Sequence, residues 1–150
     1  MFTQDFKEFL ELLNKNQVEY LIVGGYAVAM HGYPRYTGDL DIWINANRET
    51  AAKMLQVLDE FGFGSLGLRQ EDFMESGNVI QMGYPPFRID ILTGADGVDF
   101  AQCHRNRVIV EHDGMLIPIL DIQDLRTNKA ATGRPKDLDD LQNLNDPARD

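Results

Sequence analysis

The stretch LIVGGYAVAMHGYPRYTGDLDIWI, residues 21–44, decides the fold. A short aliphatic run over 19–23 ends at Gly24-Gly25, which predicts a buried strand followed by a tight turn. In DLDIWI, residues 39–44, apolar and acidic or aromatic side chains alternate, as they do in a strand whose two faces differ. Between them, residues 26–31 have a helix-compatible composition. The stretch therefore predicts strand, helix and strand in succession.

The segments on either side supply further helices and two β-hairpins. Apolar residues at helical spacing predict amphipathic helices over 4–15, 48–61 and 121–132, and Pro135 is placed to open a last helix. The hairpins are expected over 78–92, around Gly83-Tyr84-Pro85-Pro86, and over 107–119, around Asp113-Gly114. This order predicts an α+β fold, an α/β sandwich in which a mixed sheet packs helices on one face. Residues 1–150 are expected to form one domain, with the helical segment 121–145 packed on it.

Composition excludes several classes of protein. The chain has 150 residues, a formal net charge of −10 and one cysteine, Cys103. A strongly acidic protein repels nucleic acid at long range, which argues against a broad electrostatic grip on RNA or DNA. One cysteine excludes an internal disulfide framework, and no apolar run approaches the length of a membrane span. These features predict a cytoplasmic protein that makes no membrane contact.

Three aspartates are the candidate catalytic residues. Asp39 and Asp41 lie two residues apart on a predicted strand, so both carboxylates leave the same face. Asp90 occupies the polar face of RIDIL, residues 88–92, and if the two strands are neighbours the three carboxylates converge. Carboxylates this close repel one another, and a divalent cation removes the repulsion. The cluster therefore predicts a site for Mg²⁺ or Mn²⁺.

The Gly24-Gly25 pair is the candidate phosphate-binding turn. Glycines between a strand and a helix let backbone N–H groups approach a phosphate, helped by the positive end of the helix. The same pair also marks ordinary tight turns, so it becomes informative only together with the aspartates.

In combination these motifs resemble the DNA polymerase β-type nucleotidyltransferase superfamily. LIVGG is followed by thirteen residues, then DLDIWI, then a distant RIDIL. The superfamily's signature is an apolar strand ending in Gly-Gly or Gly-Ser, an Asp-x-Asp strand and a third acidic residue on a later strand. Residues 24–42 are similar to the opening of lincosamide and aminoglycoside nucleotidyltransferases and of abortive-infection toxins, and KAATGRPKDLDD, residues 129–140, resembles a later motif of those toxins.

The resemblance implies an enzyme that transfers a nucleoside monophosphate from a nucleoside triphosphate to a hydroxyl, releasing pyrophosphate. It implies that Asp39 and Asp41 bind the metal that bridges the triphosphate. Asp90 would complete a second metal site and act as general base. The implied nucleotide contacts come from the glycine turn, the segment before the aspartate strand and a later helix: Gly24, Gly25, Arg35, Thr37 and Lys129.

Each of the last three residues has a simpler interpretation that the sequence leaves open. Arg35 could pair with a surface acid, Thr37 could be a turn or cap residue, and Lys129 could be a solvated helix residue. Arg134 or Lys136 would assist Lys129. The acids that follow, Asp137 and Asp140, are expected to orient these cations rather than bind metal.

The substrates are less constrained. ATP is the default donor because it is abundant, and the acceptor could be a small molecule, an RNA end or a protein side chain. A homodimer could complete the cleft. The alternative hypothesis is a catalytically weak or inactive module that binds a nucleotide or a partner protein, as half of a toxin–antitoxin pair.

Overall fold

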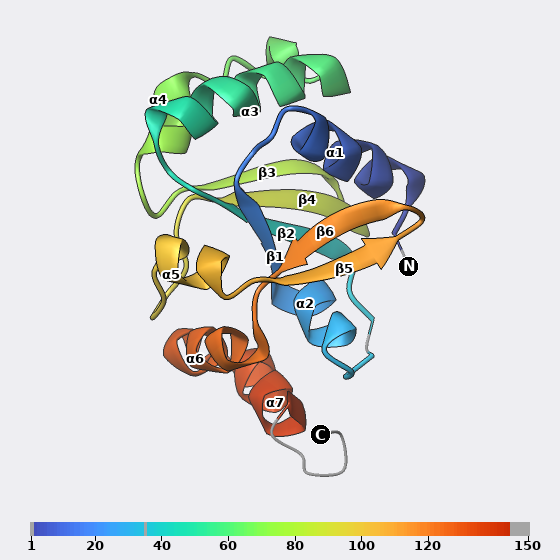
Figure 1. The fold of residues 1–150 in the computed structure, drawn as a ribbon, viewed down its shortest axis with the longest axis vertical. Coiled ribbons are helices and arrows are strands. Elements are labelled where there is room, and N and C mark those ends of the chain that lie inside the picture. Colours follow the sequence, from blue (N-terminus) through green and yellow to red (C-terminus); the bar gives the residue numbers. More distant parts are fainter. Residues whose placement is uncertain (1, 35, 145–150) are drawn as a thin grey trace.

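The computed structural model describes residues 2–34 and 36–144 and confirms the α+β class. A mixed sheet of six strands runs through the middle of the molecule, with helices above and below it in the view of Figure 1. The strand order is β3-β4-β2-β1-β6-β5. In chain order the strands are β1 (Tyr20–Val23), β2 (Asp39–Ile44), β3 (Val79–Tyr84), β4 (Phe87–Leu92), β5 (Val108–His112) and β6 (Met115–Ile119).

The central strands come from the stretch that decides the fold. β1 and β2 pair antiparallel, and each has a parallel partner on its other side, β6 beside β1 and β4 beside β2. Both predicted hairpins are present, as β3–β4 and β5–β6. The second turns at Asp113-Gly114, where both residues have positive φ, of 51° and 77°. This is the backbone that an Asp-Gly hairpin turn favours.

The long helices begin and end close to where the sequence predicts. Thr3 caps α1, because its hydroxyl accepts a hydrogen bond from the Phe6 N–H at 3.1 Å. α3 ends at Gly62 in the left-handed conformation, with φ of 94°. Pro135 is the first residue of the last helix. The four long helices are α1 (Gln4–Lys15), α3 (Arg48–Phe61), α6 (Ile122–Thr132) and α7 (Pro135–Leu144).

The core fixes which face of β2 carries the acids. Leu40, Ile42 and Ile44 are fully buried in the same apolar cluster as Phe9 of α1 and Met54 of α3. Because side chains alternate along a strand, Asp39 and Asp41 point to the opposite face. Sequence alternation therefore settles the direction of the acids, and burial of the aliphatic side chains maintains it.

Several short elements are absent from the sequence-based prediction. The helix predicted over 26–31 is present as α2 (Gly24–Met30) and begins two residues earlier, at the glycine pair itself. The unpredicted elements are a 3₁₀ turn (Gly64–Leu66), α4 (Gln70–Met74) and α5 (Phe100–Arg105). Segments of three to six residues are too short to show a helical repeat, and capping and tertiary contacts stabilise them instead. In α5 the Asp99 carboxylate accepts from the Gln102 N–H at 3.2 Å, and Phe100 packs edge-to-face on Trp43 at 5.1 Å.

Among residues 2–34 and 36–144, no helix combines the length and apolar character that a membrane crossing requires.

A pair of leucine truncations tests this account of the core. Leu10 of α1 is fully buried, whereas Leu138 of α7 is 51% exposed. Leu10→Ala is expected to lower the free energy of unfolding by about 2 to 5 kcal/mol, because it leaves a cavity in the core. Leu138→Ala is expected to change it by less than about 1 kcal/mol. Urea unfolding followed by circular dichroism measures both, and equal losses would contradict the assignment of the core.

Candidate active site

The structure brings the three predicted aspartates together on one face of two neighbouring strands. β2 and β4 run parallel with Asp41 opposite Asp90 and Asp39 opposite Arg88. Asp39 and Asp41 are two residues apart on β2, so their side chains share the face that Asp90 uses on β4. The side chain of Asp39 is 40% exposed and that of Asp90 is 9% exposed. The cluster therefore opens to solvent at the Asp39 end.

The surroundings of Asp41 change its acidity. Burial, followed by the charges of Asp90 and Asp39, raises the pKa of Asp41 to about 7. Lys136 and Lys129 act in the opposite direction and lower it. The two neighbouring acids therefore outweigh the two lysines, and the net charge around Asp41 is negative. An additional cation near Asp41 would reduce the repulsion among the carboxylates.

The backbone of Gly24 lies directly against Asp41. Gly24 is the first residue of α2 and has a φ of 68°, which disfavours any residue with a side chain. A Cβ atom at this position would overlap the Oδ2 atom of Asp41. Gly25 follows in the same turn and is buried. Gly24 is thus required for close approach of the helix start to a carboxylate, in addition to its role in the turn.

A cavity of about 350 Å³ adjoins Asp41. Its floor includes Gly24 and Asp41, and the C-terminal helices supply Asn128, Lys129 and Arg134. Residues 76–79, where the chain enters β3, and loop residues 94–96 also line it. The lining therefore combines acids, Asp41, Asp96 and Asp137, with the cations Lys129 and Arg134, and such a mixture can hold a metal-bound phosphate chain.

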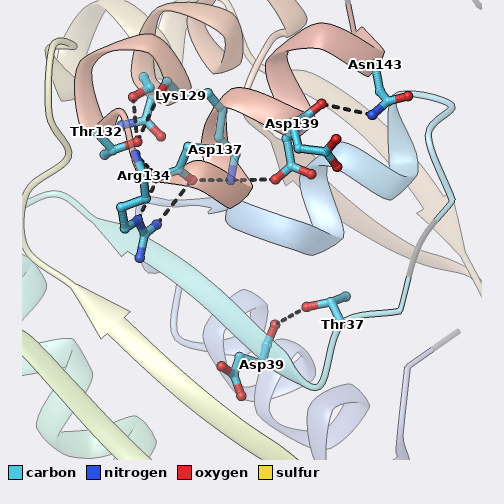
Figure 2. Close-up of polar contacts among 10 residues, drawn as sticks. Thr37, Asp39, Lys129, Thr132, Arg134, Asp137, Asp139 and Asn143 are labelled. Atoms are coloured by element: carbon cyan, nitrogen blue, oxygen red, sulfur yellow. Dashed lines mark hydrogen bonds and ion pairs between the residues drawn. The ribbon is translucent and has the colours of Figure 1, made fainter.

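Lys129, one of the predicted nucleotide contacts, is held in a buried ion-pair network. Its ammonium lies 3.1 Å from Asp137 Oδ1 and 3.1 Å from Asp140 Oδ2. Figure 2 shows Lys129, Arg134 and Asp137 at the junction of α6 and α7, across from the strand that carries Asp39. The expectation that Asp137 and Asp140 orient cations is met. Lys129 lines the cavity with a side chain only 4% exposed, so it is no solvated surface residue.

Asp137 anchors two cations at once. It is fully buried, and Arg134 donates to it through Nε at 2.6 Å and through Nη2 at 3.2 Å. Burial would raise the pKa of Asp137, but the hydrogen bonds from Arg134 and Lys129 outweigh it and hold the pKa well below its usual range. The Arg134 side chain itself is 61% exposed, so this charge faces the cavity mouth.

The two remaining predicted contacts lie before β2. Thr37 donates from Oγ1 to the Asp39 carbonyl oxygen at 3.3 Å, a contact visible in Figure 2 that supports the entry to the strand. This is the behaviour of a turn residue. Arg35 lies outside the described residues.

Sequence reasoning missed Arg88. Its guanidinium donates to both oxygens of Asp90, from Nε at 2.7 Å and from Nη2 at 3.0 Å, and Nη2 also donates to Asp39 at 3.1 Å. The hydrogen bonds and charge of Asp90 raise the pKa of Arg88. The sequence RIDIL, residues 88–92, already indicates that Arg88 lies on the same strand face as Asp90, because residues two apart on a strand share a face.

The donor set fits a metal that is shared with a ligand. Within residues 2–34 and 36–144, no three His, Cys, Asp or Glu side chains are grouped so that they could hold an ion unaided. Mg²⁺ bound beside a nucleotide usually takes one or two carboxylates and completes its octahedron with phosphate and water oxygens. Asp39 and Asp41, on one strand face, are the residues that would supply the protein's share of such a site.

Comparison with known protein families identifies the chain's family. A family model described as "Nucleotidyltransferase of unknown function (DUF6036)" matches residues 2–145. A search of curated protein sequences returned no match.

Solved structures share the fold at low sequence identity. A candidate nucleotidyltransferase from Thermotoga maritima superposes with a TM-score of 0.62 at 20% identity, over 92% of this chain and 88% of the other. The lincosamide antibiotic adenylyltransferase LnuA, solved with lincomycin bound, gives 0.60 at 18% identity over 96% of both chains. The antibiotic-resistance factor ANT(2'')-Ia gives 0.57 at 13% identity, over 93% of this chain and 80% of the other.

Two glycine substitutions separate backbone strain from contact with Asp41. Gly24 and Gly62 both have positive φ, but a Cβ at Gly62 would meet nothing within 4 Å. Gly62→Ala is expected to cost about 1 kcal/mol of stability, from strain alone. Gly24→Ala is expected to cost about 2 to 4 kcal/mol, because it also displaces Asp41. Thermal unfolding compares the two variants, and an equal effect would exclude the predicted overlap.

The pH dependence of stability tests the environment of Asp41. A pKa raised to about 7 means that the folded protein holds this proton more tightly than the unfolded chain. The resulting stabilisation is fully present at low pH and is lost as the pH rises to about 7. Asp41→Asn cannot lose a proton, so its stability relative to wild type should increase by about 1 to 2 kcal/mol between pH 5 and pH 8.

The control for this measurement is Glu60→Gln. A hydrogen bond from Lys15 holds the pKa of Glu60 below its ordinary value, so this group stays ionised throughout that range. Its difference from wild type should be flat between pH 5 and pH 8, measured by chemical unfolding in a chelator-containing buffer. A flat difference for Asp41→Asn as well would show that Asp41 titrates as an ordinary carboxylate.

Proposed function

Because the chain belongs to the nucleotidyltransferase family DUF6036, whose function is unknown, we propose that it transfers a nucleoside monophosphate to a hydroxyl acceptor. The observation that carries the proposal is the shared face of Asp39, Asp41 and Asp90 beside a cavity lined by Lys129 and Arg134. In this reaction the acceptor oxygen bonds to the α-phosphorus, the bond to the β-phosphate oxygen breaks, and pyrophosphate leaves.

Mg²⁺ or Mn²⁺ is the proposed cofactor, held by Asp39 and Asp41, with Asp90 available to a second ion. The metal would supply charge neutralisation at the phosphate oxygens. The chain's own residues would bind the triphosphate, accept the proton and stabilise the leaving group. Gly24 and Gly25 allow the triphosphate to approach the start of α2 closely.

Asp90 is the proposed general base. Its carboxylate lies beside Asp41 on the adjacent strand and is fixed by two hydrogen bonds from Arg88. A carboxylate so placed can accept the acceptor hydroxyl's proton as the oxygen attacks. Arg134 and Lys136 face the same region, and they are suited to stabilise the charge that builds on the departing pyrophosphate.

We also propose a donor and a class of acceptor. Adenylyl transfer, named in the description of the structurally similar LnuA, makes ATP the first donor to test. The net charge of −10 favours a small-molecule or protein hydroxyl over an RNA end.

A catalytically weak binding module is the second candidate function. The specific observation in its favour is that Arg88 already neutralises two of the three acids. Such a protein would bind nucleotide without transferring it.

Label transfer distinguishes the two candidates. The protein is incubated with each α-labelled nucleoside triphosphate, a fractionated cell lysate and Mg²⁺ or Mn²⁺, and labelled products are separated by size and chemistry. Transfer is expected with at least one triphosphate. Asp41→Asn should reduce the rate about 100-fold or more, because transition-state charge loses its stabilisation.

Asp139→Asn is the matched control, because Asp139 is an exposed acid of α7 beside the buried Asp137 and Asp140. It should leave the rate unchanged within twofold. Absence of label transfer from all four triphosphates would reject the enzymatic proposal in favour of the binding module.

A further inference from the structure

Arg88 bridges two of the three acids of the cluster, Asp39 and Asp90. One nitrogen, Nη2, is within hydrogen-bond distance of two different carboxylates, 3.1 Å from Asp39 Oδ2 and 3.0 Å from Asp90 Oδ2. Its neighbour Nε contacts the other oxygen of Asp90 at 2.7 Å. The guanidinium therefore joins β4 to β2 through their acids.

A guanidinium and a divalent ion are alternative partners for these oxygens. A divalent ion held by Asp39 and Asp41 would share the Asp39 carboxylate with Arg88, whose Nη2 donates to Asp39 Oδ2 and to Asp90 Oδ2. Arginine stays protonated at all physiological pH values, so deprotonation cannot remove it. A metal that takes Asp39 Oδ2 as a ligand would therefore compete directly with the charge-assisted hydrogen bond from Nη2.

Of the hydrogen bonds that Arg88 donates, the one to Asp39 is the easiest to break. Arg88 and Asp90 are two residues apart on one strand and share two hydrogen bonds, so the strand itself keeps them adjacent. The contact with Asp39 is a single hydrogen bond between two strands, and the Asp39 side chain is 40% exposed against 9% for Asp90. Asp39 therefore has the weaker attachment and the space to turn.

We propose that Arg88 is a positioning residue that competes with the divalent metal for Asp39 while it keeps Asp90 oriented. This inference rests on the proposed nucleotidyl transfer. The consequence is coupled binding: the metal alone binds weakly, because it must displace Arg88 from Asp39. The metal and the nucleoside triphosphate together bind strongly, because phosphate oxygens add ligands that offset that displacement.

Mn²⁺ binding measured by electron paramagnetic resonance tests this coupling without relying on activity. Free Mn²⁺ is counted in titrations of wild type and Arg88→Met, each with and without a non-hydrolysable ATP analogue. Arg88→Met is expected to bind Mn²⁺ alone about tenfold or more tightly than wild type, because the competing hydrogen bond is gone. The gain that the analogue produces should shrink by the same factor.

Two further variants separate the loss of the hydrogen bonds from the loss of a positive charge. Arg88→Lys retains the charge but cannot span both carboxylates with a planar fork, so its Mn²⁺ affinity should shift in the same direction as that of Arg88→Met. If circular dichroism shows that Arg88→Met does not fold, Arg88→Lys takes its place in the comparison with wild type. Arg105→Met removes an exposed arginine at the end of α5 and should leave Mn²⁺ affinity unchanged within twofold.

The possible results are distinct. Increased affinity at residue 88, with no change at residue 105, supports the competition. Equal or weaker Mn²⁺ binding in both residue-88 variants overturns it, while metal-dependent nucleotide binding by wild type would still stand. Absence of Mn²⁺ binding by every protein, even with the analogue present, would reject the proposed function and this inference with it.

Discussion

Repulsion among three carboxylates on one sheet face is the constraint on which the rest of the site depends. Leu40, Ile42 and Ile44 are fully buried on the other side of β2, so their burial forces Asp39 and Asp41 outward. The parallel pairing of β2 with β4 then adds Asp90 to the same face. Each aliphatic side chain contributes about 1.5 to 3 kcal/mol by leaving water. The hydrophobic core thus maintains an arrangement of like charges that would otherwise separate.

Three cations from different elements offset this negative charge. Arg88 contacts two of the acids directly, whereas Lys129 and Lys136 lower the pKa of the third from the C-terminal helices. Lys129 is buried between Asp137 and Asp140, and an ammonium in that position is tolerated only because both its partners are charged. The same network fixes α6 and α7 beside the cavity. The helices that carry the cations are therefore positioned by ion pairs as well as by apolar packing.

Much of the fold and part of the site follow from sequence pattern alone. The alternation in DLDIWI predicts the strand and the direction of its acids, and Asp113-Gly114 predicts a hairpin whose turn has the expected positive φ values. The short helices α4 and α5 were not predicted, because capping and tertiary contacts stabilise them without a repeating apolar pattern. Adjacency of β2 and β4 also needed the structure, since pairing between distant strands leaves no local signal. Arg88 was overlooked although its spacing from Asp90 gave its face.

The central claim is that these acids hold a nucleotide's phosphate chain through a shared divalent ion. Isothermal titration calorimetry with Mg²⁺ and a non-hydrolysable ATP analogue tests it most directly, with wild type compared with the double variant Asp39→Asn/Asp41→Asn. Wild type is expected to bind the analogue only with Mg²⁺ present, and the double variant is expected to lose that binding. Equal affinity in the two proteins, or binding by wild type that persists in a chelator, would contradict the claim.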